Sequence, residues 1–413
     1  MAEGVHGFAE LDASVGLEVH FIAASDGGQS TGYLYRPHRS ARQVVYFMHP
    51  RAQMARHALI PALTTAGYAV FAHHSRYVNN DADCLHELLL LDIAAGMRAL
   101  RAAGFEQVFL VGHSGGASLF SFYQSQAEKL PSERLTTAPS GDPVPLAAAE
   151  MPLADAFVTL AGHPGEGRFM LNVLDPAVLD ESNPNVTDQR FDMYDERNGY
   201  RPFPEKSRYN PGWLDEYRAR QVERSRRLDA IAREYITETA AAAASENGDR
   251  RSRGAKWLGR YMVIYRTLAN PAHLDLRIWP NNRDIGSIFS PGDPIIGNYH
   301  GQGLSRVMTP RGWLSTWSGT ASNAEVPVSV AHVAVPTLFI YPDADRDVFP
   351  HEQDEYLAAS AATDKTLVPI EWVDHSLNAV GEEGRRLGDP KERVAGVLTV
   401  WLRERFGEPH AAT

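Results

Sequence analysis

The chain has 413 residues, of which 44% are hydrophobic and 22% are charged, and its formal net charge is -11 at pH 7. This is the composition of a folded globular protein, and the negative charge argues against nonspecific binding to nucleic acid or to an anionic membrane. No stretch approaches the roughly 20 apolar residues of a membrane span, and no basic segment precedes an apolar run at the N-terminus, so we expect a cytoplasmic protein.

Predicted strands and helices alternate in the first third of the chain. Apolar runs of strand length, such as QVVYFMH at 43–49, are followed by segments of helical periodicity that end at glycine. This alternation predicts an α/β protein with a mostly parallel sheet and helices on both faces. The expected strands are 17–24, 31–36, 43–49, 68–73, 107–111 and 155–161, and the expected helices are 54–66, 84–103 and 116–127.

The alternation then stops for about 170 residues, a length that favours an inserted layer over a single loop. An amphipathic helix is expected there at 214–236, and the alanine run that starts at Ala240 either extends this helix or forms a mobile loop. The basic residues Arg250, Arg251 and Arg253 are interpreted as part of a solvated loop. After the gap, the expected strands are 335–341 and 366–372, and the expected helices are 351–362 and 391–406.

A candidate nucleophile lies between the expected strand at 107–111 and the expected helix at 116–127. The segment Gly112-His113-Ser114-Gly115-Gly116 matches the pattern G-x-S-x-G, which is a weak signal by itself. A serine on such a turn needs small neighbours because the backbone there is strained. The alternative is a glycine-rich turn with an incidental serine, but the strand before it and the helix after it favour a nucleophile.

A serine hydroxyl needs a histidine to take its proton and a carboxylate to orient that histidine. With this serine the chain resembles the α/β-hydrolase superfamily over most of its length outside the insertion. The family's chain order is serine, acid, histidine. The segment YPDAD is similar to the family's acid loop, with Pro342 in place of the usual glycine, and implies Asp345 as the acid. Asp343 and Asp347 are the alternatives. The segment VDHSL is similar to the family's histidine turn and implies His375 as the base.

The same resemblance implies an oxyanion hole made by two backbone N–H groups. Gly115 follows the nucleophile and supplies the first. The second comes from the loop after the strand at 43–49, where the chain has His49-Pro50-Arg51 in place of the family's His-Gly-x, so Arg51 is the expected donor. The Arg51 guanidinium either binds a substrate carboxylate or pairs with an acidic neighbour. His49 is a further candidate for contact with the substrate.

An insertion after the sixth strand usually forms a cap over the nucleophile in this superfamily. We therefore predict a mainly helical cap at 165–323, between core segments at 1–164 and 324–413. Aromatic residues are frequent in 257–317 and suit an apolar or aromatic ligand, although they are also the material of a cap core. The sequence leaves open whether the protein is a homodimer.

No cofactor and no metal are expected. The sequence has neither a dinucleotide-binding fingerprint nor a phosphate loop. The alternating aspartates from Asp343 to Asp347 resemble the start of a calcium loop, but Val348 stands where that loop needs glycine and Asp354 where it needs glutamate. The only cysteine, Cys84, excludes an internal disulfide and a cysteine cluster for a metal.

Together these residues predict a serine hydrolase that cleaves a carboxylic ester of a small apolar or aromatic substrate through an acyl-enzyme. Hydrolysis of a carbon-carbon bond in a diketone, thioester hydrolysis and acyl transfer use the same groups and are the enzymatic alternatives. Epoxide hydrolases and haloalkane dehalogenases of this fold use an aspartate nucleophile, so Ser114 argues against them. The alternative without catalysis is a ligand-binding receptor on a hydrolase scaffold.

Overall fold

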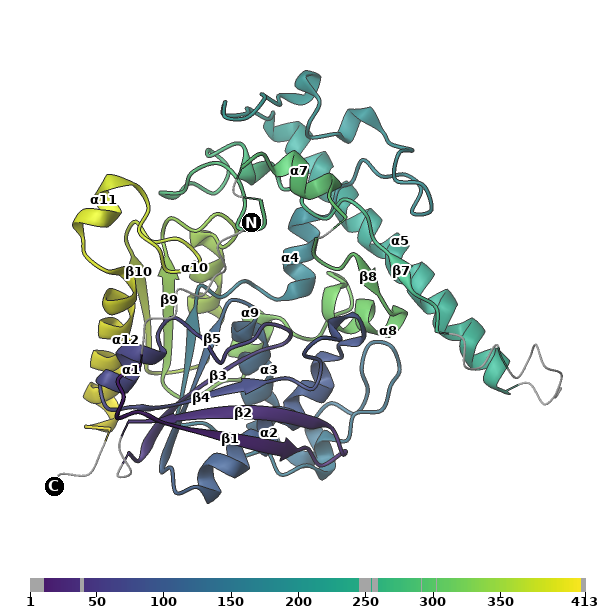
Figure 1. Ribbon diagram of the computed structural model, residues 1–413. Coiled ribbons are helices and arrows are strands. Elements are labelled where there is room, and N and C mark those ends of the chain that lie inside the picture. Colours follow the sequence, from purple (N-terminus) through teal and green to yellow (C-terminus); the bar gives the residue numbers. More distant parts are fainter. Residues whose placement is uncertain are drawn as a thin grey trace.

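A computed structural model describes residues 11–37, 41–244, 254, 259–290, 292–301 and 303–409. Its centre is an eight-stranded sheet with the order β1-β2-β4-β3-β5-β6-β9-β10 (Figure 1). Only β2 runs against its two neighbours, and the other strand pairs are parallel, which confirms the expected sheet. The strands are β1 (Gly16–Ala23), β2 (Gln29–Arg36), β3 (Gln43–His49), β4 (Ala69–His74), β5 (Gln107–His113), β6 (Ala156–Leu160), β9 (Thr337–Pro342) and β10 (Lys365–Ile370).

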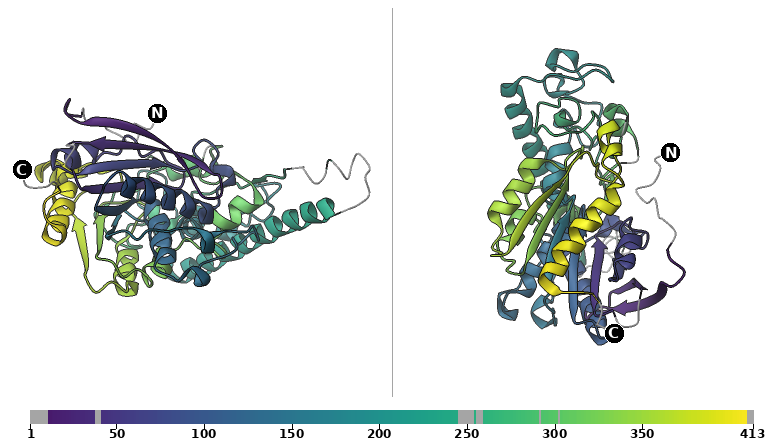
Figure 2. Two further views of the ribbon diagram at one scale, coloured as in Figure 1. Left: turned by 90° about the horizontal axis from the view of Figure 1, so that it is seen from below. Right: turned by 90° about the vertical axis from the view of Figure 1, so that its left-hand side faces the viewer.

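Helices cover both faces of this sheet, and each face has its own apolar core. One core packs side chains of α2, α3, α9 and α10 against the strands, and the other packs α1 and α12. Figure 2 shows α10 and α12 on opposite sides of the last two strands. Central strands such as β3 are buried along their whole length, which explains their unbroken apolar runs. The helices are α1 (Ile60–Thr65), α2 (His86–Ala102), α3 (Gly116–Ala127), α9 (Val326–Val330), α10 (Pro350–Ala359), α11 (Gly381–Arg386) and α12 (Pro390–Phe406).

The insertion lies between β6 and β9 and contains two apolar clusters apart from those of the sheet. Its longest element is α5, which continues through the alanine run to Ala244 because alanine has the strongest helix propensity. This helix runs away from the sheet in Figure 1. Arg250, Arg251 and Arg253 lie outside the described residues. The elements of the insertion are α4 (Glu166–Val173), α5 (Pro211–Ala244), β7 (Met262–Val263), α7 (Pro294–Tyr299), β8 (Val307–Met308) and α8 (Pro310–Gly312).

The helix predicted at 54–66 is shorter in the structure. The chain forms turns from Met54 onward, and α1 begins only at Ile60. Proline lacks an N–H and its ring clashes with the preceding turn, so Pro61 is accommodated only in the first turn of a helix. The earlier start was therefore wrong. Among the described residues no helix combines the length and the apolar character that a membrane crossing requires.

Candidate active site

Ser114 occupies a sharp turn between β5 and α3. Its backbone has a φ of 56°, a conformation that is strained for a residue with a side chain, and its N–H donates to Leu160 O at 2.9 Å. The turn requires close backbone contacts. A Cβ on Gly112 would lie 2.4 Å from Gly116 O, and a Cβ on Gly116 would lie 2.4 Å from Met48 O. The glycines of the motif are therefore needed for space, and the turn presents Ser114 at the carboxyl edge of the parallel strands.

The structure brings Ser114, His375 and Asp345 together. Ser114 Oγ lies 3.0 Å from His375 Nε2, and His375 Nδ1 lies 2.6 Å from Asp345 Oδ2. The other oxygen of the buried Asp345 accepts the backbone N–H groups of Asp347 at 2.9 Å and Val348 at 3.2 Å. Burial by itself lowers the pKa of His375, but the attraction of Asp345 and its hydrogen bond outweigh burial and raise the pKa above 6.5. This is the geometry of a base that is oriented by a carboxylate.

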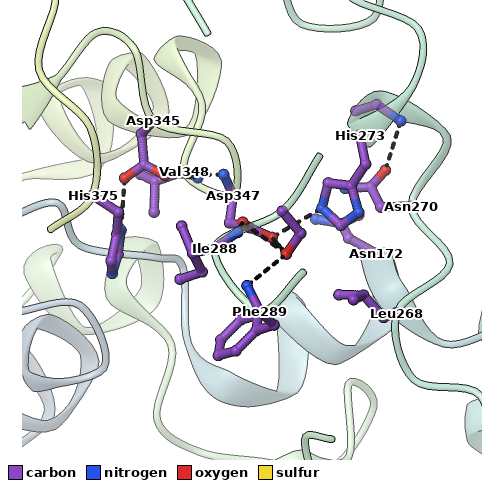
Figure 3. Close-up of polar contacts among 12 residues, drawn as sticks. Asn172, Leu268, Asn270, His273, Ile288, Phe289, Asp345, Asp347, Val348 and His375 are labelled. Atoms are coloured by element: carbon purple, nitrogen blue, oxygen red, sulfur yellow. Dashed lines mark hydrogen bonds and ion pairs between the residues drawn. The ribbon is translucent and has the colours of Figure 1, made fainter. Parts of the chain in front are cut away.

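The two alternative acids point away from His375, and Figure 3 shows this for Asp347. Asp347 accepts hydrogen bonds from His273 Nε2 at 2.9 Å, from Ser287 Oγ and from the N–H of Ile288 at 2.7 Å. All three partners belong to the insertion. Asp343 likewise accepts from the side-chain amide of Asn282 at 2.7 Å and from the backbone N–H of Trp372 at 2.5 Å. These two carboxylates therefore fasten the insertion to the acid loop, while Asp345 faces the histidine.

Two further histidines, His113 and His57, form a chain of hydrogen bonds that ends at the backbone oxygen of His375. The sequence did not identify this role. His113 Nε2 lies 3.0 Å from His375 O, and His113 Nδ1 lies 2.9 Å from His57 Nε2. The N–H of Leu59 donates to His57 Nδ1 at 3.3 Å. Because a carbonyl only accepts, His113 must donate through Nε2 and accept at Nδ1. This chain of hydrogen bonds holds the backbone of His375 in place.

The two predicted oxyanion donors, the backbone N–H groups of Gly115 and Arg51, differ in whether they already donate to another group of the protein. The N–H of Gly115 donates to no group of the described chain and lies at the N-terminus of α3. The N–H of Arg51, by contrast, donates to His49 Nδ1 at 3.2 Å. The Arg51 guanidinium carbon lies 5.0 Å from the centre of a Trp317 ring, and its buried Nε has no hydrogen-bond partner among the described residues. Among the described residues, Arg51 forms no ion pair with a carboxylate within 4.0 Å. The expected pairing of its guanidinium with an acidic neighbour is therefore not formed.

A buried acid beside Gly115, Glu166, was also not identified from the sequence. Glu166 Oε1 would lie 2.3 Å from a Cβ on Gly115, and Oε2 lies 3.5 Å from His86 Nε2 and accepts from Ser118 Oγ at 3.2 Å. Burial raises the pKa of Glu166 to about 7, although Arg51 acts in the opposite direction. Burial also lowers the pKa of His86 to about 3, so this histidine is neutral. Glu166 follows β6, and the rule that ligands bind at the carboxyl ends of parallel strands is the signal that could have found it.

Two cavities that share lining residues lie beside Ser114. One of about 180 Å³ is lined by Ser114, His375, His49 and Arg51 together with apolar side chains. The other, of about 20 Å³, has room for one water-sized group and is lined by Ser114, Arg51 and Glu166. A larger hollow of about 690 Å³ lies along α5. None of the described residues that line it is a histidine, so it lacks a base of the kind that lies beside Ser114. The insertion contributes Phe169, Ile288, Phe289, Leu304 and Trp317 to the walls of the two cavities at Ser114.

In the part of the chain that the structure describes, no three side chains of histidine, cysteine, aspartate or glutamate converge in a way that could hold a metal ion. The carboxylates of Asp343, Asp345 and Asp347, which resemble a calcium loop in sequence, turn toward three different partners.

Comparison with known proteins gives a likeness of fold. No known family profile matches the chain, and no curated protein matches its sequence. The solved structure of DcsB in complex with a substrate analogue covers 94% of this chain and 99% of its own, with a TM-score of 0.50 and 11% identity. The hypothetical protein PA2218 from Pseudomonas aeruginosa covers 96% and 97%, with a TM-score of 0.48 and 13% identity. The esterase domain of a Rhodothermus marinus protein covers 94% and 98%, with a TM-score of 0.43 and 13% identity.

At this identity, likeness to DcsB speaks for the fold alone. Together with the order and direction of the strands and the turn at Ser114, it assigns the chain to the α/β-hydrolase fold, with an insertion after β6.

Proposed function

Taking the α/β-hydrolase fold as the starting point, we propose that this protein is a serine hydrolase that cleaves a carboxylic ester of a small apolar or aromatic substrate through an acyl-enzyme. The observation that carries the proposal is the pair of contacts from Ser114 Oγ to His375 Nε2 at 3.0 Å and from His375 Nδ1 to Asp345 Oδ2 at 2.6 Å. A hydroxyl, a base and a carboxylate in this order form an activated nucleophile.

In the proposed reaction, Ser114 Oγ adds to the ester carbonyl carbon while His375 Nε2 takes the hydroxyl proton. The tetrahedral intermediate collapses, the bond to the alcohol oxygen breaks, and His375 returns the proton to this oxygen. Water then attacks the acyl-enzyme with His375 again as the base, which releases the acid and restores Ser114. Asp345 keeps the imidazole oriented and stabilises its charged form.

The segment 165–323 is proposed to act as the cap that selects the substrate. Support comes from Ile288 and Phe289, which line both cavities at Ser114. A cavity of about 180 Å³ with mostly apolar walls fits a short acyl or aryl group better than a long chain.

Turnover of a substrate panel tests the proposal. Wild-type protein is expected to hydrolyse short-chain and aryl esters faster than thioesters or 1,3-diketones, and a fluorophosphonate probe is expected to label Ser114 in the folded protein. Faster cleavage of thioesters or diketones would move the reaction to one of these alternative classes. A folded protein that neither turns over any of these compounds nor reacts with the probe would point to the receptor alternative.

For an ester that also carries a carboxylate, Arg51 is proposed to bind that carboxylate, because it is the only lysine or arginine among the described residues that line the two cavities. Arg51→Ala is expected to raise KM for a monoester of a dicarboxylic acid about 10- to 100-fold relative to KM for the neutral diester, the effect of losing a charge-assisted bidentate contact. The backbone N–H is retained in this variant. Arg51→Lys is expected to recover only part of the loss because lysine lacks the planar fork. Equal changes in KM for both esters would contradict the assignment.

The pH profile is expected to depend on two groups. Since the base must be neutral, kcat/KM should rise with pH as His375 loses its proton, at a pH above the ordinary 6.5. Glu166, with its pKa raised to about 7 by burial, becomes negative over the same range, beside Gly115, where the oxyanion forms. Glu166→Gln is therefore expected to match wild type in acid and to exceed its kcat/KM on the order of three- to tenfold in alkali. Superimposable profiles of the two proteins would show that the Glu166 charge does not reach the oxyanion.

A further inference from the structure

His49 ends β3 at the edge of the sheet where Ser114 lies. Its buried ring accepts two backbone N–H groups at Nδ1, from Arg51 at 3.2 Å and from Ala52 at 3.0 Å. A neutral imidazole has one donor and one acceptor nitrogen, so these two partners assign the proton of His49 to Nε2.

The ring stays neutral over the working range of a hydrolase. Burial lowers the pKa of His49 well below 6.5, and the nearby charge of Arg51 lowers it further. His49 Nε2–H is thus a fixed, uncharged donor that neither gains nor loses a proton when the medium changes around neutral pH.

This donor lies beside Gly115. His49 Nε2 is 2.9 Å from the point that a Cβ on Gly115 would occupy, and Glu166 Oε1 and His163 Nε2 lie 2.3 Å and 3.2 Å from the same point. Within the described chain His49 Nε2 donates to neither of them, and Glu166 Oε1 has no hydrogen-bond partner there. His49 and Ser114 line the same cavity of about 180 Å³. A carbonyl group attacked by Ser114 Oγ has to place its oxygen in this region, next to the N–H of Gly115.

We propose that His49 is a catalytic residue whose Nε2–H is the second donor of the oxyanion hole. The inference rests on the proposed hydrolase function and replaces the donor expected from the sequence, because the N–H of Arg51 is directed to His49 Nδ1. The loop after β3 then supplies its donor through a side chain, and the backbone of the loop serves to orient that side chain.

The step balances without a proton transfer from His49. As Ser114 Oγ bonds to the carbonyl carbon, the π pair of the carbonyl moves onto its oxygen, and His375 takes the hydroxyl proton. The negative oxygen accepts hydrogen bonds from Gly115 N–H and His49 Nε2–H. When the intermediate collapses, the pair returns to the carbonyl and the leaving group departs, while His49 keeps its proton throughout.

A matched pair of variants separates the two nitrogens of His49. In His49→Asn the side-chain oxygen takes the place of Nδ1 and can hold the loop, but no donor reaches Gly115. In His49→Gln the terminal amide takes the place of Nε2 and can donate, while the acceptor for Arg51 and Ala52 is lost. The readout is the second-order rate at which a fluorophosphonate labels Ser114, because phosphonylation also builds negative charge on an oxygen in the hole and requires no knowledge of the natural ester.

His49→Asn is expected to label about 10²- to 10³-fold more slowly than wild type, and His49→Gln is expected to label at least about tenfold faster than His49→Asn. Turnover of an ester should fall in kcat with KM little changed, since the contact forms only in the transition state. The melting temperatures should rank the other way, with His49→Gln the less stable of the two because it loses the loop acceptor.

If wild type labels at Ser114 and folded His49→Asn labels equally fast, the inference is overturned and the N–H of Arg51 remains the donor. Absence of labelling in wild type would overturn the proposed function and the inference together. Should His49→Asn not fold, wild-type protein still gives the answer by proton NMR. Addition of a trifluoromethyl ketone, which forms an oxyanion on Ser114, should move the Nε2 proton of His49 downfield, and an unmoved resonance would contradict the proposal.

Discussion

Ser114→Ala is expected to lower kcat for the best ester on the order of 10⁶-fold, the loss typical of removing the nucleophile from a serine triad. The loss is this large because Ser114 is the hydroxyl that contacts His375 Nε2, and without it only binding and the oxyanion donors remain to act on a water molecule. KM should change little, since alanine fits the same turn and leaves both cavities open. Steady-state assay of purified protein, together with loss of fluorophosphonate labelling, measures the effect.

Ser121→Ala is the matched control for this variant. Ser121 is a buried serine of the adjoining helix α3, and its Oγ donates only to the backbone oxygen of Ser118 at 3.1 Å. Both variants should have melting temperatures close to wild type, and Ser121→Ala should keep its labelling and turnover. Comparable loss in the two proteins would mean that the defect comes from packing of α3, and residual labelling of Ser114→Ala would identify another nucleophile.

The core of the fold was predictable because burial on both faces imposes an unbroken apolar run on each central strand. The runs at 43–49 and 107–111 therefore identify β3 and β5, and the helix at 116–127 matches α3 in both bounds. Elements with less apolar content were harder to identify. The helix α11 consists of glycine and charged residues and has no hydrophobic spacing, and α4 has only eight residues, so its apolar face is a short signal.

The residues around Ser114 were predictable to different degrees. Ser114 and Gly115 follow from the G-x-S-x-G turn between a strand and a helix, whereas Asp345 and His375 follow from the resemblance to the acid loop and the histidine turn of α/β-hydrolases. The direction of the Arg51 N–H depends on the rotamer of His49, whose ring competes for nearby backbone N–H groups, and sequence spacing does not specify this rotamer. The position of Glu166 beside Gly115 depends on the path of the chain from β6 into the insertion, and sequence spacing does not specify this path.

Sequence and geometry together identify which of three aspartates orients His375. The acid loop carries Asp343, Asp345 and Asp347 within five positions. The sequence favours Asp345 only through its register in the acid loop of the family. In the structure Asp345 Oδ2 lies 2.6 Å from His375 Nδ1, whereas the other two carboxylates accept hydrogen bonds from the insertion.

Asp345→Asn is accordingly expected to lower kcat about 10⁴-fold without unfolding the protein. An asparagine amide that still accepts the N–H groups of Asp347 and Val348 must turn its NH₂ toward His375, which forces the proton of the ring onto Nε2. The imidazole then has no free nitrogen to take the proton of Ser114, and its charged form loses the carboxylate that stabilises it. The pKa of His375 should fall in the variant, so the rising limb of its residual pH profile should move to lower pH.

Asp343→Asn provides the control because it changes the same charge in the same loop. It removes the acceptor of Asn282 Nδ2, a contact between the core and the insertion, so its cost should appear mainly as a lower melting temperature. We expect its kcat to stay within about tenfold of wild type, because Asp343 has no contact with His375. A larger loss of kcat in Asp343→Asn than in Asp345→Asn would show that the carboxylate orienting His375 during catalysis is not the one that faces it in the structure.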